Sequence, residues 1–182
     1  LIGRGISSCA TCDGFFYKGK DVFVVGGGDS AMEEALFLTK FANSINVIHR
    51  RDKLKASKIM QDRAFKNNKI RFVWDSEVVE IIGENKVSGV RINNLKTNKT
   101  SELKGDGLFV AVGHLPNSEI FVDLEKDEKG YLIVKDNIFT SIPGVFVCGD
   151  VHDHRYKQAV TAAGLGCMAA MEAEKWLEPN KK

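Results

Sequence analysis

The sequence predicts a protein of the α/β class that contains a Rossmann-like nucleotide-binding domain. Three observations lead to this prediction. Short, nearly continuous apolar and β-branched runs are typical of parallel strands buried on both faces. Apolar residues at helical spacing follow these runs. A glycine cluster, Gly26-Gly27-Gly28, joins the first such strand to the first such helix, as nucleotide-binding turns do.

The first half of the chain alternates strands and helices. Strands are predicted at residues 21–26, 44–49 and 69–74, and helices at residues 29–42 and 54–67. The predicted inward positions of the two helices are Ala31, Met32, Ala35, Leu38 and Ala42, then Ala56, Ile59, Met60, Ala64 and Phe65. Between residues 76 and 112 the periodicity changes to short runs set among turn residues. That change predicts an antiparallel meander packed on the βαβ unit, followed by a buried strand at 107–112.

The chain breaks sharply at residues 113–117, Gly-His-Leu-Pro-Asn, which we interpret as a crossover between two lobes. Strands are predicted beyond it at residues 131–134 and 145–148, and a final helix at 158–177. Small residues along that helix predict close packing. The last few residues read as a frayed tail.

Composition limits the class of protein. The 182 residues are 43% hydrophobic and carry a formal net charge of +2, which is typical of a soluble globular protein. This charge is too small to indicate a nucleic-acid or anionic membrane partner. No apolar run approaches the roughly 20 residues that span a bilayer. Four cysteines, Cys9, Cys12, Cys148 and Cys167, do not form a secreted disulfide scaffold, so a cytoplasmic location is expected.

The glycine cluster and the residues after it, Gly26-Gly27-Gly28-Asp29-Ser30-Ala31, fit G-x-G-x-x-A. Gly26 would permit the tight turn, Gly28 would let the backbone approach a pyrophosphate, and Ala31 would allow close helix–strand packing. The alternative interpretation is a glycine-rich turn that binds nothing.

The end of the second strand predicts which nicotinamide cofactor binds. An NAD site usually has an acidic residue there, whereas this chain has His49-Arg50-Arg51, with Lys53 and Lys55 nearby. Guanidinium groups bind a 2′-phosphate and a carboxylate repels it, so NADPH is predicted over NADH. The alternative is a solvated basic patch.

Cys9-Ala10-Thr11-Cys12-Asp13 is a C-x-x-C motif with an acid beside it. Two such cysteines can close a small disulfide ring and reopen it by exchange. Asp13 is placed to take up and release the proton that the exchange needs. Half a zinc site, a buried inert pair and a structural disulfide are the alternatives, and no metal site is predicted. Cys148 and Cys167 lie among small or apolar residues and are expected to be core residues.

These motifs together resemble the bacterial-type, low-molecular-weight thioredoxin reductases. The resemblance runs from about Gly3 to Leu177. It rests on Cys-Ala-Thr-Cys-Asp-Gly, Val-Gly-Gly-Gly-Asp-Ser-Ala, His-Arg-Arg-Asp, Phe-Val-Ala-Val-Gly-His-Leu-Pro-Asn and Pro-Gly-Val-Phe-Val-Cys-Gly-Asp. The cysteine pair just before the nucleotide glycine turn is the specific part, because related flavoenzymes that reduce ferredoxin lack it.

The resemblance implies an enzyme that moves electrons from NADPH through FAD to the disulfide of thioredoxin. It implies that Cys12 lies next to the flavin, that Cys9 attacks the thioredoxin disulfide and that Asp13 is the acid–base residue. Gly149-Asp150 would hold the ribityl chain, and Lys157-Gln158-Ala159 would contact the isoalloxazine. A homodimer, two rotating lobes and linkers near residues 1–5 and 113–118 are also implied.

The resemblance further implies how the chain divides. Residues 1–115 would form the redox-active, NADPH-binding domain, residues 116–178 the C-terminal part of a second, FAD/NAD(P)-type Rossmann-like domain, and residues 179–182 a tail. The N-terminal βαβ unit of the FAD domain is expected to be missing. Lys55 and Lys157 stand where the family commonly has arginine. A truncated NADPH-binding module without flavin chemistry, a reductase of another disulfide and, last, a zinc-binding domain remain alternative hypotheses.

Overall fold

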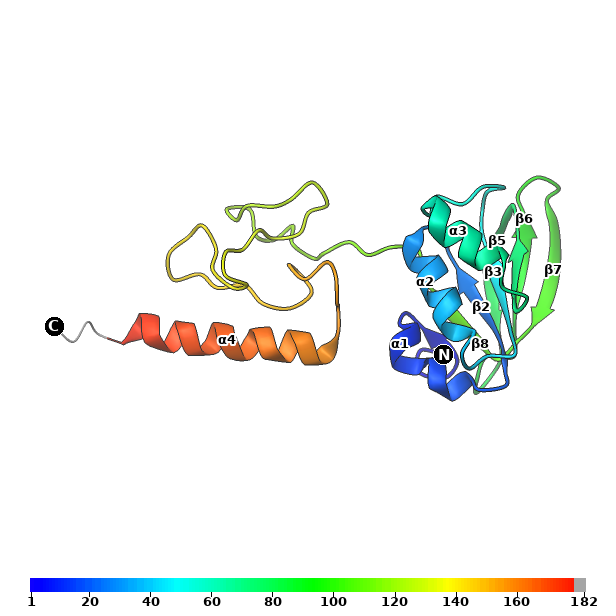
Figure 1. Ribbon diagram of the computed structural model, residues 1–182, viewed down its shortest axis with the longest axis horizontal. Coiled ribbons are helices and arrows are strands. Elements are labelled where there is room, and N and C mark those ends of the chain that lie inside the picture. Colours follow the sequence, from blue (N-terminus) through cyan, green and yellow to red (C-terminus); the bar gives the residue numbers. More distant parts are fainter. Residues whose placement is uncertain (179–182) are drawn as a thin grey trace. The chain divides into compact units, whose positions relative to one another are not determined.

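The protein divides into two compact units, unit 1 at residues 1–113 and unit 2 from His114 onward (Figure 1). We describe them separately, from a computed structural model that describes residues 1–178. The predicted tail, residues 179–182, lies outside the described residues. The division falls at the predicted Gly-His-Leu-Pro-Asn break. No described helix has both the length and the apolar character that a membrane span needs.

The centre of unit 1 is a five-stranded parallel sheet in the order β1-β8-β2-β3-β4. Its strands are β1 (Ile6–Ser7), β2 (Asp21–Val25), β3 (Ser44–Ile48), β4 (Ile70–Val73) and β8 (Gly107–Val110). The apolar runs form these strands because both faces of the sheet are covered: Val22, Phe23 and Val24 are fully buried in succession. The predicted strands of this sheet are therefore confirmed, with ends one or two residues shorter than predicted.

Helices cover one face of the parallel sheet (Figure 1). They are α1 (Ala10–Asp13), the 3₁₀ turn η1 (Gly14–Tyr17), α2 (Asp29–Leu38) and α3 (Lys58–Phe65). All five inward positions predicted for residues 29–42 are fully buried. The inward positions Ile59 and Phe65 predicted for the next helix are wrong, since these side chains are 69% and 51% exposed. That helix begins at Lys58 rather than 54, so Ile59 lies in its first turn. The ring of Phe65 packs at a tilt against that of Phe72.

The other face of the sheet packs against an antiparallel meander, as predicted (Figure 1). Its strands are β5 (Ser76–Ile82), β6 (Gly89–Asn94) and β7 (Lys99–Lys104). Val90 and Ile92 of the meander meet the β2 residue Phe23 in a second core cluster. Unit 1 therefore has the predicted mixed α/β fold, with one parallel and one antiparallel sheet.

Unit 2 consists of loops followed by α4 (Ala159–Leu177), the predicted final helix. The strands predicted at 131–134 and 145–148 are wrong, because these segments form only the isolated bridges Lys126–Leu132 and Phe139–Phe146. A strand persists only where a neighbour accepts its hydrogen bonds over several residues. In the described part of unit 2, each of these two segments pairs with a neighbour at a single residue only.

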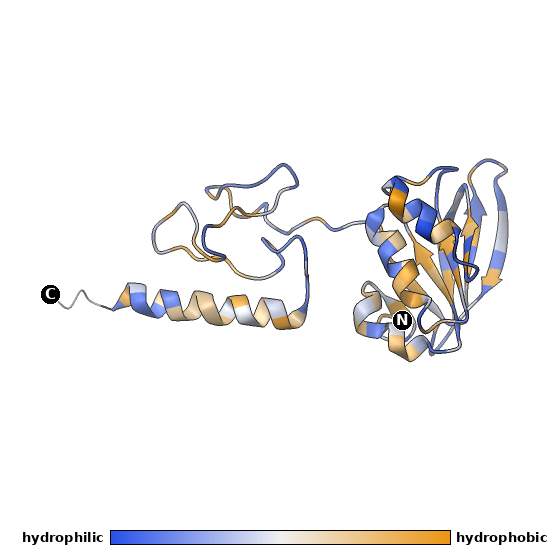
Figure 2. Ribbon diagram, viewed as in Figure 1, coloured by the Kyte–Doolittle hydropathy of each residue, from blue (hydrophilic) through white to orange (hydrophobic). Residues whose placement is uncertain are grey.

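The apolar residues of unit 2 are largely uncovered. Figure 2 shows α4 as mainly apolar in composition, yet Ala169 is the buried hydrophobic residue of this helix. Cys148 and Cys167, expected in a core, are both exposed free thiols. That expectation was wrong because it assumed a strand at 145–148 and a covered face on α4.

Candidate functional site

The cysteine motif connects β1 to α1. Cys9 and Cys12 are joined by a disulfide, with their Cα atoms 5.3 Å apart. Cys9 is the N-cap of α1, and its Sγ accepts a hydrogen bond from the Cys12 backbone N–H at 3.1 Å. Cys9 is half-buried and Cys12 is exposed, so the disulfide is accessible for thiol exchange.

The acid of the motif, Asp13, is held by the side chain of Ser7, which no sequence pattern singles out. The hydroxyl of the buried Ser7 donates a hydrogen bond to Asp13 Oδ2, with the two oxygens 2.6 Å apart. The same Ser7 oxygen accepts the Cys9 backbone N–H at 3.1 Å. Ser7 therefore ties Asp13 to the start of the disulfide loop, so that all three predicted redox residues lie on one turn. A lone serine carries no spacing pattern from which this role could be predicted.

A second carboxyl lies against the same loop. Glu34 belongs to α2, which contacts α1, and its Oε2 atom is buried without a hydrogen-bond partner among the described residues. Burial raises the pKa of Glu34 to about 7, opposed by a hydrogen bond from the Ala10 backbone N–H. Sequence patterns do not single out Glu34, because a charged residue on an amphipathic helix is normally solvated.

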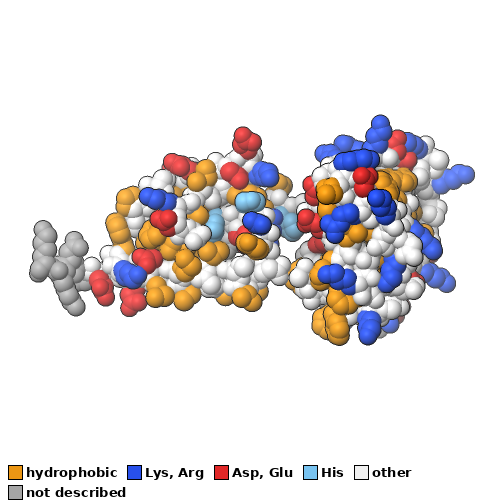
Figure 3. Space-filling view, in the orientation of Figure 1, with side chains coloured by type: hydrophobic (Ala, Val, Ile, Leu, Met, Phe, Trp, Pro, Cys, Tyr) orange, Lys and Arg blue, Asp and Glu red, His pale blue; other side chains and the backbone are white. Residues whose placement is uncertain are grey.

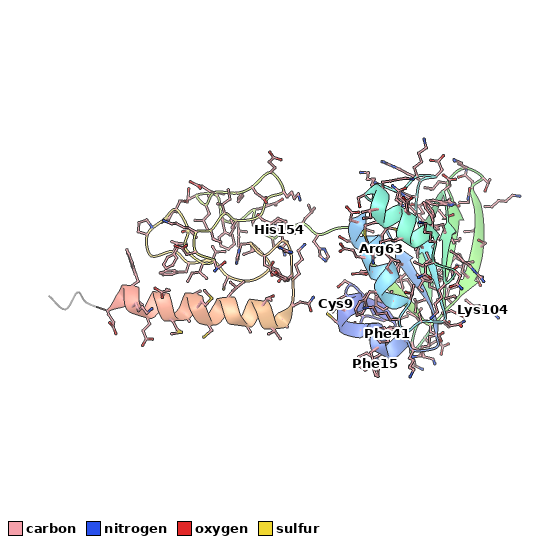
Figure 4. The ribbon with its side chains drawn as sticks, in the orientation of Figure 1. Cys9, Phe15, Phe41, Arg63, Lys104 and His154 are labelled. Atoms are coloured by element: carbon pink, nitrogen blue, oxygen red, sulfur yellow. A yellow bond between two sulfur atoms is a disulfide. The ribbon has the colours of Figure 1, made fainter. Side chains whose placement is uncertain are left out.

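Exposed aromatic rings follow the cysteine motif directly. Phe15 and Phe16 are 66% and 69% exposed. Phe15 makes edge contacts with Phe16 and with Phe41, at centroid distances of 6.3 and 6.0 Å, and Phe37 lies 5.7 Å from Phe41. We call these four phenylalanines the aromatic surface. Figure 4 shows Cys9, Phe15 and Phe41 at the same end of unit 1.

The backbone of the glycine turn is accessible to a ligand at one of its three glycines, Gly28. Gly26 has φ +153°, and a Cβ there would overlap the Ala111 carbonyl oxygen. A Cβ on Gly27 would overlap the imidazole of His49. A Cβ on Gly28, the N-cap of α2, would meet nothing within 4 Å. The first two glycines therefore satisfy packing within the protein, whereas Gly28 keeps its backbone accessible at the start of a helix.

Backbone hydrogen bonds fix the basic segment against the glycine turn. The Gly27 carbonyl accepts the N–H groups of Lys55 and Ala56 at 2.7 and 3.0 Å. Asp29 Oδ1 accepts both the N–H and the hydroxyl of Ser57, at 2.7 and 2.8 Å. Asp29, predicted as a cofactor residue, is thus occupied in capping the segment that leads into α3.

Two residues that flank the arginines in the chain make contacts of their own. His49 is buried, packs beneath Gly27, and has its Nε2 3.0 Å from the Lys53 carbonyl oxygen. Asp52, next to the arginines, pairs with Lys96 at 3.1 Å, and the hydrogen bond from Lys96 lowers the pKa of that carboxyl. Lys96 also pairs with Asp75 at 3.0 Å, so a single cation bridges two carboxylates beside the basic segment.

A pocket of about 490 Å³ brings the glycine turn and the basic segment together. This volume suits a cofactor-sized ligand. The predicted residues that line it are Gly26, Gly28, Ser30, His49, Arg50, Arg51 and Lys55. Ala31 is fully buried at the helix–strand contact and does not line it. The space-filling view shows many Lys and Arg side chains on the visible face of unit 1 (Figure 3).

The predicted flavin residues lie in unit 2 around the start of α4. Gly149 has φ +79° and Lys157 has φ +50°, Gln158 is the N-cap, and Ala159 begins the helix. A pocket of about 470 Å³ lies nearby, but other residues line it. They are Asn137, His152, Asp153, His154, Arg155, Tyr156, Thr161, Gly164, Leu165 and Met168.

Two residues of this pocket have shifted pKa values. Burial lowers the pKa of His152, whose Nε2 is buried without a partner among the described residues. For Asp153, burial acts to raise the pKa, but hydrogen bonds from three backbone N–H groups and from Thr161 outweigh it, and the pKa is lowered. The loop before α4 is therefore organised around an ionised carboxylate.

A family model described as pyridine nucleotide-disulphide oxidoreductase matches residues 2–166. The chain belongs to this family. Thioredoxin reductases of Streptomyces clavuligerus and Rickettsia conorii are similar to it, at 56% identity over 179 residues and 54% over 180 residues. The aligned regions cover 97% and 96% of this chain, but 56% and 58% of those proteins. The chain thus spans somewhat more than half the length of these family members.

Solved structures of the oxidoreductase family agree with the fold. The crystal structure of thioredoxin reductase from Streptococcus pyogenes has a TM-score of 0.91 at 48% identity, covering 96% of this chain and 58% of that one. Thioredoxin reductase from Giardia duodenalis gives 0.86 at 46% identity, covering 97% and 59%. The predicted Rossmann-like α/β class and the resemblance to bacterial-type thioredoxin reductases are both confirmed.

Proposed function

We propose that the chain is the NADPH-binding and disulfide-bearing part of a thioredoxin reductase that uses FAD. One observation carries the proposal: unit 1 holds both an accessible Cys9–Cys12 disulfide and a pocket lined by a glycine turn and three cations. The helix α2 links them, since it begins at the glycine turn and contacts α1. Residues 1–115 are the nucleotide and redox domain in this proposal, and residues 116–178 belong to the flavin domain.

The pocket favours NADPH over NADH. The pyrophosphate would lie over Gly28, where the backbone is open and the N-terminal N–H groups of α2 offer positive charge. Arg50, Arg51 and Lys55 line the same pocket, and the neighbouring Asp52 is paired with Lys96. A 2′-phosphate would meet three cations there, against Glu77 as the single carboxylate-bearing residue of the pocket lining.

Unit 2 has features that fit a bound flavin. The buried His152 Nε2 lacks a partner among the described residues, and His152 lines the unit 2 pocket. Gly149, Asp150, Lys157, Gln158 and Ala159 are the residues that would hold FAD. When bound, FAD would accept a hydride from NADPH and deliver two electrons to the disulfide.

The chain's own residues perform the exchange. Reduction of the disulfide takes up two electrons and two protons and gives the Cys9 and Cys12 thiols. Cys9, as thiolate, attacks one sulfur of the target disulfide and expels the other as a thiolate, and Asp13 supplies or removes the proton. Cys12 then attacks Cys9, which re-forms the Cys9–Cys12 disulfide and releases the target as a dithiol.

A protein disulfide suits this site better than a small one. The aromatic surface begins two residues after Asp13, and its Phe15 and Phe16 rings are mostly exposed. Exposed aromatic clusters commonly bind protein partners. We propose thioredoxin as the partner, a homodimer as the assembly and the cytoplasm as the location.

The test is an assay of the protein that carries this chain, with FAD bound. We expect one NADPH, followed at 340 nm, to be consumed for each thioredoxin disulfide reduced. If FAD is bound and NADPH reduces it, but thioredoxin stays oxidised while another disulfide substrate is consumed, the partner is wrong. If FAD does not bind at all, the flavin assignment of unit 2 is wrong.

Two alanine substitutions distinguish the roles of the glycines. Gly28→Ala is expected to leave thermal stability unchanged, since its Cβ enters open space, but to weaken NADPH binding about tenfold by occupying the pyrophosphate position. Gly26→Ala is expected to destabilise unit 1 by about 2 kcal/mol or more, because φ is positive and the Cβ overlaps Ala111. Calorimetric binding and melting curves measure both effects. Unaltered NADPH affinity in Gly28→Ala would place the pyrophosphate elsewhere.

A further inference from the structure

A half-buried carboxyl, that of Glu34, lies against the disulfide loop and has no role in the exchange chemistry described above. Glu34 Oε2 is shielded from solvent and lacks a hydrogen-bond partner among the described residues. The other contact of this carboxyl is the backbone N–H of Ala10, the residue that follows Cys9. A buried acceptor without a partner is costly and calls for a physical explanation.

The surroundings of Glu34 leave its charge uncompensated. The helix α2 contacts α1, α3, β2 and β3. The other ionisable groups on α2 and on these elements are Cys12, Asp13, Asp21, Asp29, Glu33, Lys58, Asp62 and Arg63. None of them contributes to the shift in the pKa of Glu34, which comes from burial. The carboxyl is therefore neutral in mildly acidic solution and becomes a partly buried anion above about pH 7.

The ionisation of the Cys9 thiol, once the disulfide is reduced, is sensitive to a charge on Glu34. Cys9 Sγ accepts the Cys12 backbone N–H at 3.1 Å in the oxidised loop. After reduction the same hydrogen bond would favour a Cys9 thiolate over the thiol. A carboxylate behind Ala10 acts in the opposite direction, since two like charges in a partly buried site repel each other.

We propose that Glu34 is a positioning residue that sets the ionisation of the reduced cysteine pair, with Cys9 as the thiol it controls. Neutral Glu34 leaves the Cys9 thiolate stabilised by the Cys12 N–H. Ionised Glu34 raises the pKa of that thiol, and by linkage the thiolate raises the pKa of Glu34. The two groups therefore titrate as a coupled pair, and the loop loses thiolate as Glu34 ionises. This inference deepens the proposed function, but its test needs neither NADPH, FAD nor thioredoxin.

The experiment uses the whole 182-residue chain, reduced by dithiothreitol. The dithiol gives two electrons and two protons to the Cys9–Cys12 disulfide and becomes a cyclic disulfide itself. Iodoacetamide then alkylates the thiols at a series of pH values. Peptide mapping by mass spectrometry separates Cys9 from Cys12 and from the exposed Cys148 and Cys167.

Glu34→Gln keeps the shape and the acceptor for Ala10 but stays neutral at every pH. We expect the alkylation midpoint of Cys9 to move down by about one pH unit in this variant, since one nearby charge is removed. Below pH 6 the Cys9 alkylation rates of the wild-type chain and of Glu34→Gln should converge. Glu34 is protonated there whether Cys9 is a thiol or a thiolate. Glu33→Gln is the matched control, because it removes the same charge from an exposed neighbour on the same helix. It should leave the midpoint unchanged.

A purely structural Glu34 would change the melting temperature but not the alkylation profile. Identical midpoints in the wild-type chain and Glu34→Gln would therefore overturn the proposal, as would an equal shift in Glu33→Gln. A measurement on the wild-type chain avoids any dependence on folding of the variant. Carbon-13 NMR of the Glu34 carboxyl should show its midpoint rise when the disulfide is reduced, and an unmoved midpoint would also refute the coupling.

Discussion

The Cys9→Ser variant of the protein that carries this chain is expected to lose thioredoxin reduction by roughly 1,000-fold or more. A serine hydroxyl neither ionises near neutral pH nor forms a disulfide, so the attack on the target sulfur is removed. Reduction of the flavin by NADPH should be retained, because Cys9 does not line the pocket formed by the glycine turn and the arginines. Stopped-flow flavin bleaching and the thioredoxin assay measure the two half-reactions separately.

Cys167→Ser is the matched control for this variant. Cys167 is an exposed free thiol on α4 and has no role in the proposed mechanism. Both half-reactions should proceed at the wild-type rate in this control. If flavin reduction also fails in Cys9→Ser, the cysteine has a role in the first half-reaction and the assignment of roles is wrong. Full thioredoxin reduction without Cys9 would exclude the disulfide mechanism altogether.

The elements of unit 1 could be predicted because each pattern has a local physical cause. Parallel strands covered on both faces read as continuous apolar runs, and Val22 to Val24 show such a run. Gly26 was predicted as a tight-turn residue, and its positive φ and its contact with Ala111 agree. Spacing also predicted the cysteine loop, since three residues of separation place two sulfurs within bonding distance.

Features that depend on contacts between distant segments could not be predicted. Asp29 belongs to the nucleotide motif, yet its carboxylate accepts hydrogen bonds from Ser57, which is 28 residues away. Burial of Glu34 depends on α1 folding back over α2, and the periodicity of α2 alone places a glutamate in solvent. In unit 2, the residues of 145–148 have the composition of a buried strand, but composition does not supply the neighbouring strand that would pair with it.

Replacing Arg50 and Arg51 together by alanine is expected to raise the KM for NADPH roughly 100-fold. Each guanidinium would make a charge-assisted contact with the 2′-phosphate, and the loss of two such contacts amounts to about 3 kcal/mol at these exposed positions. NADH lacks that phosphate, so its KM should rise no more than about threefold. Flavin reduction with each nucleotide, over a range of concentrations, gives the two constants.

A control must distinguish a specific contact between the two arginines and the 2′-phosphate from the general positive charge of the segment. Lys53→Ala removes a cation from the same segment, but Lys53 does not line the pocket, and the Lys53 carbonyl that faces His49 is kept. A diffuse field of cations would make this control weaken NADPH binding nearly as much as the loss of one arginine. A bidentate phosphate site predicts almost no change, because the geometry of the guanidinium groups carries the selectivity. Equal losses for NADPH and NADH in the double variant would mean that the arginines only hold the segment in place. The basis for choosing between the two cofactors would then have to lie elsewhere in the pocket.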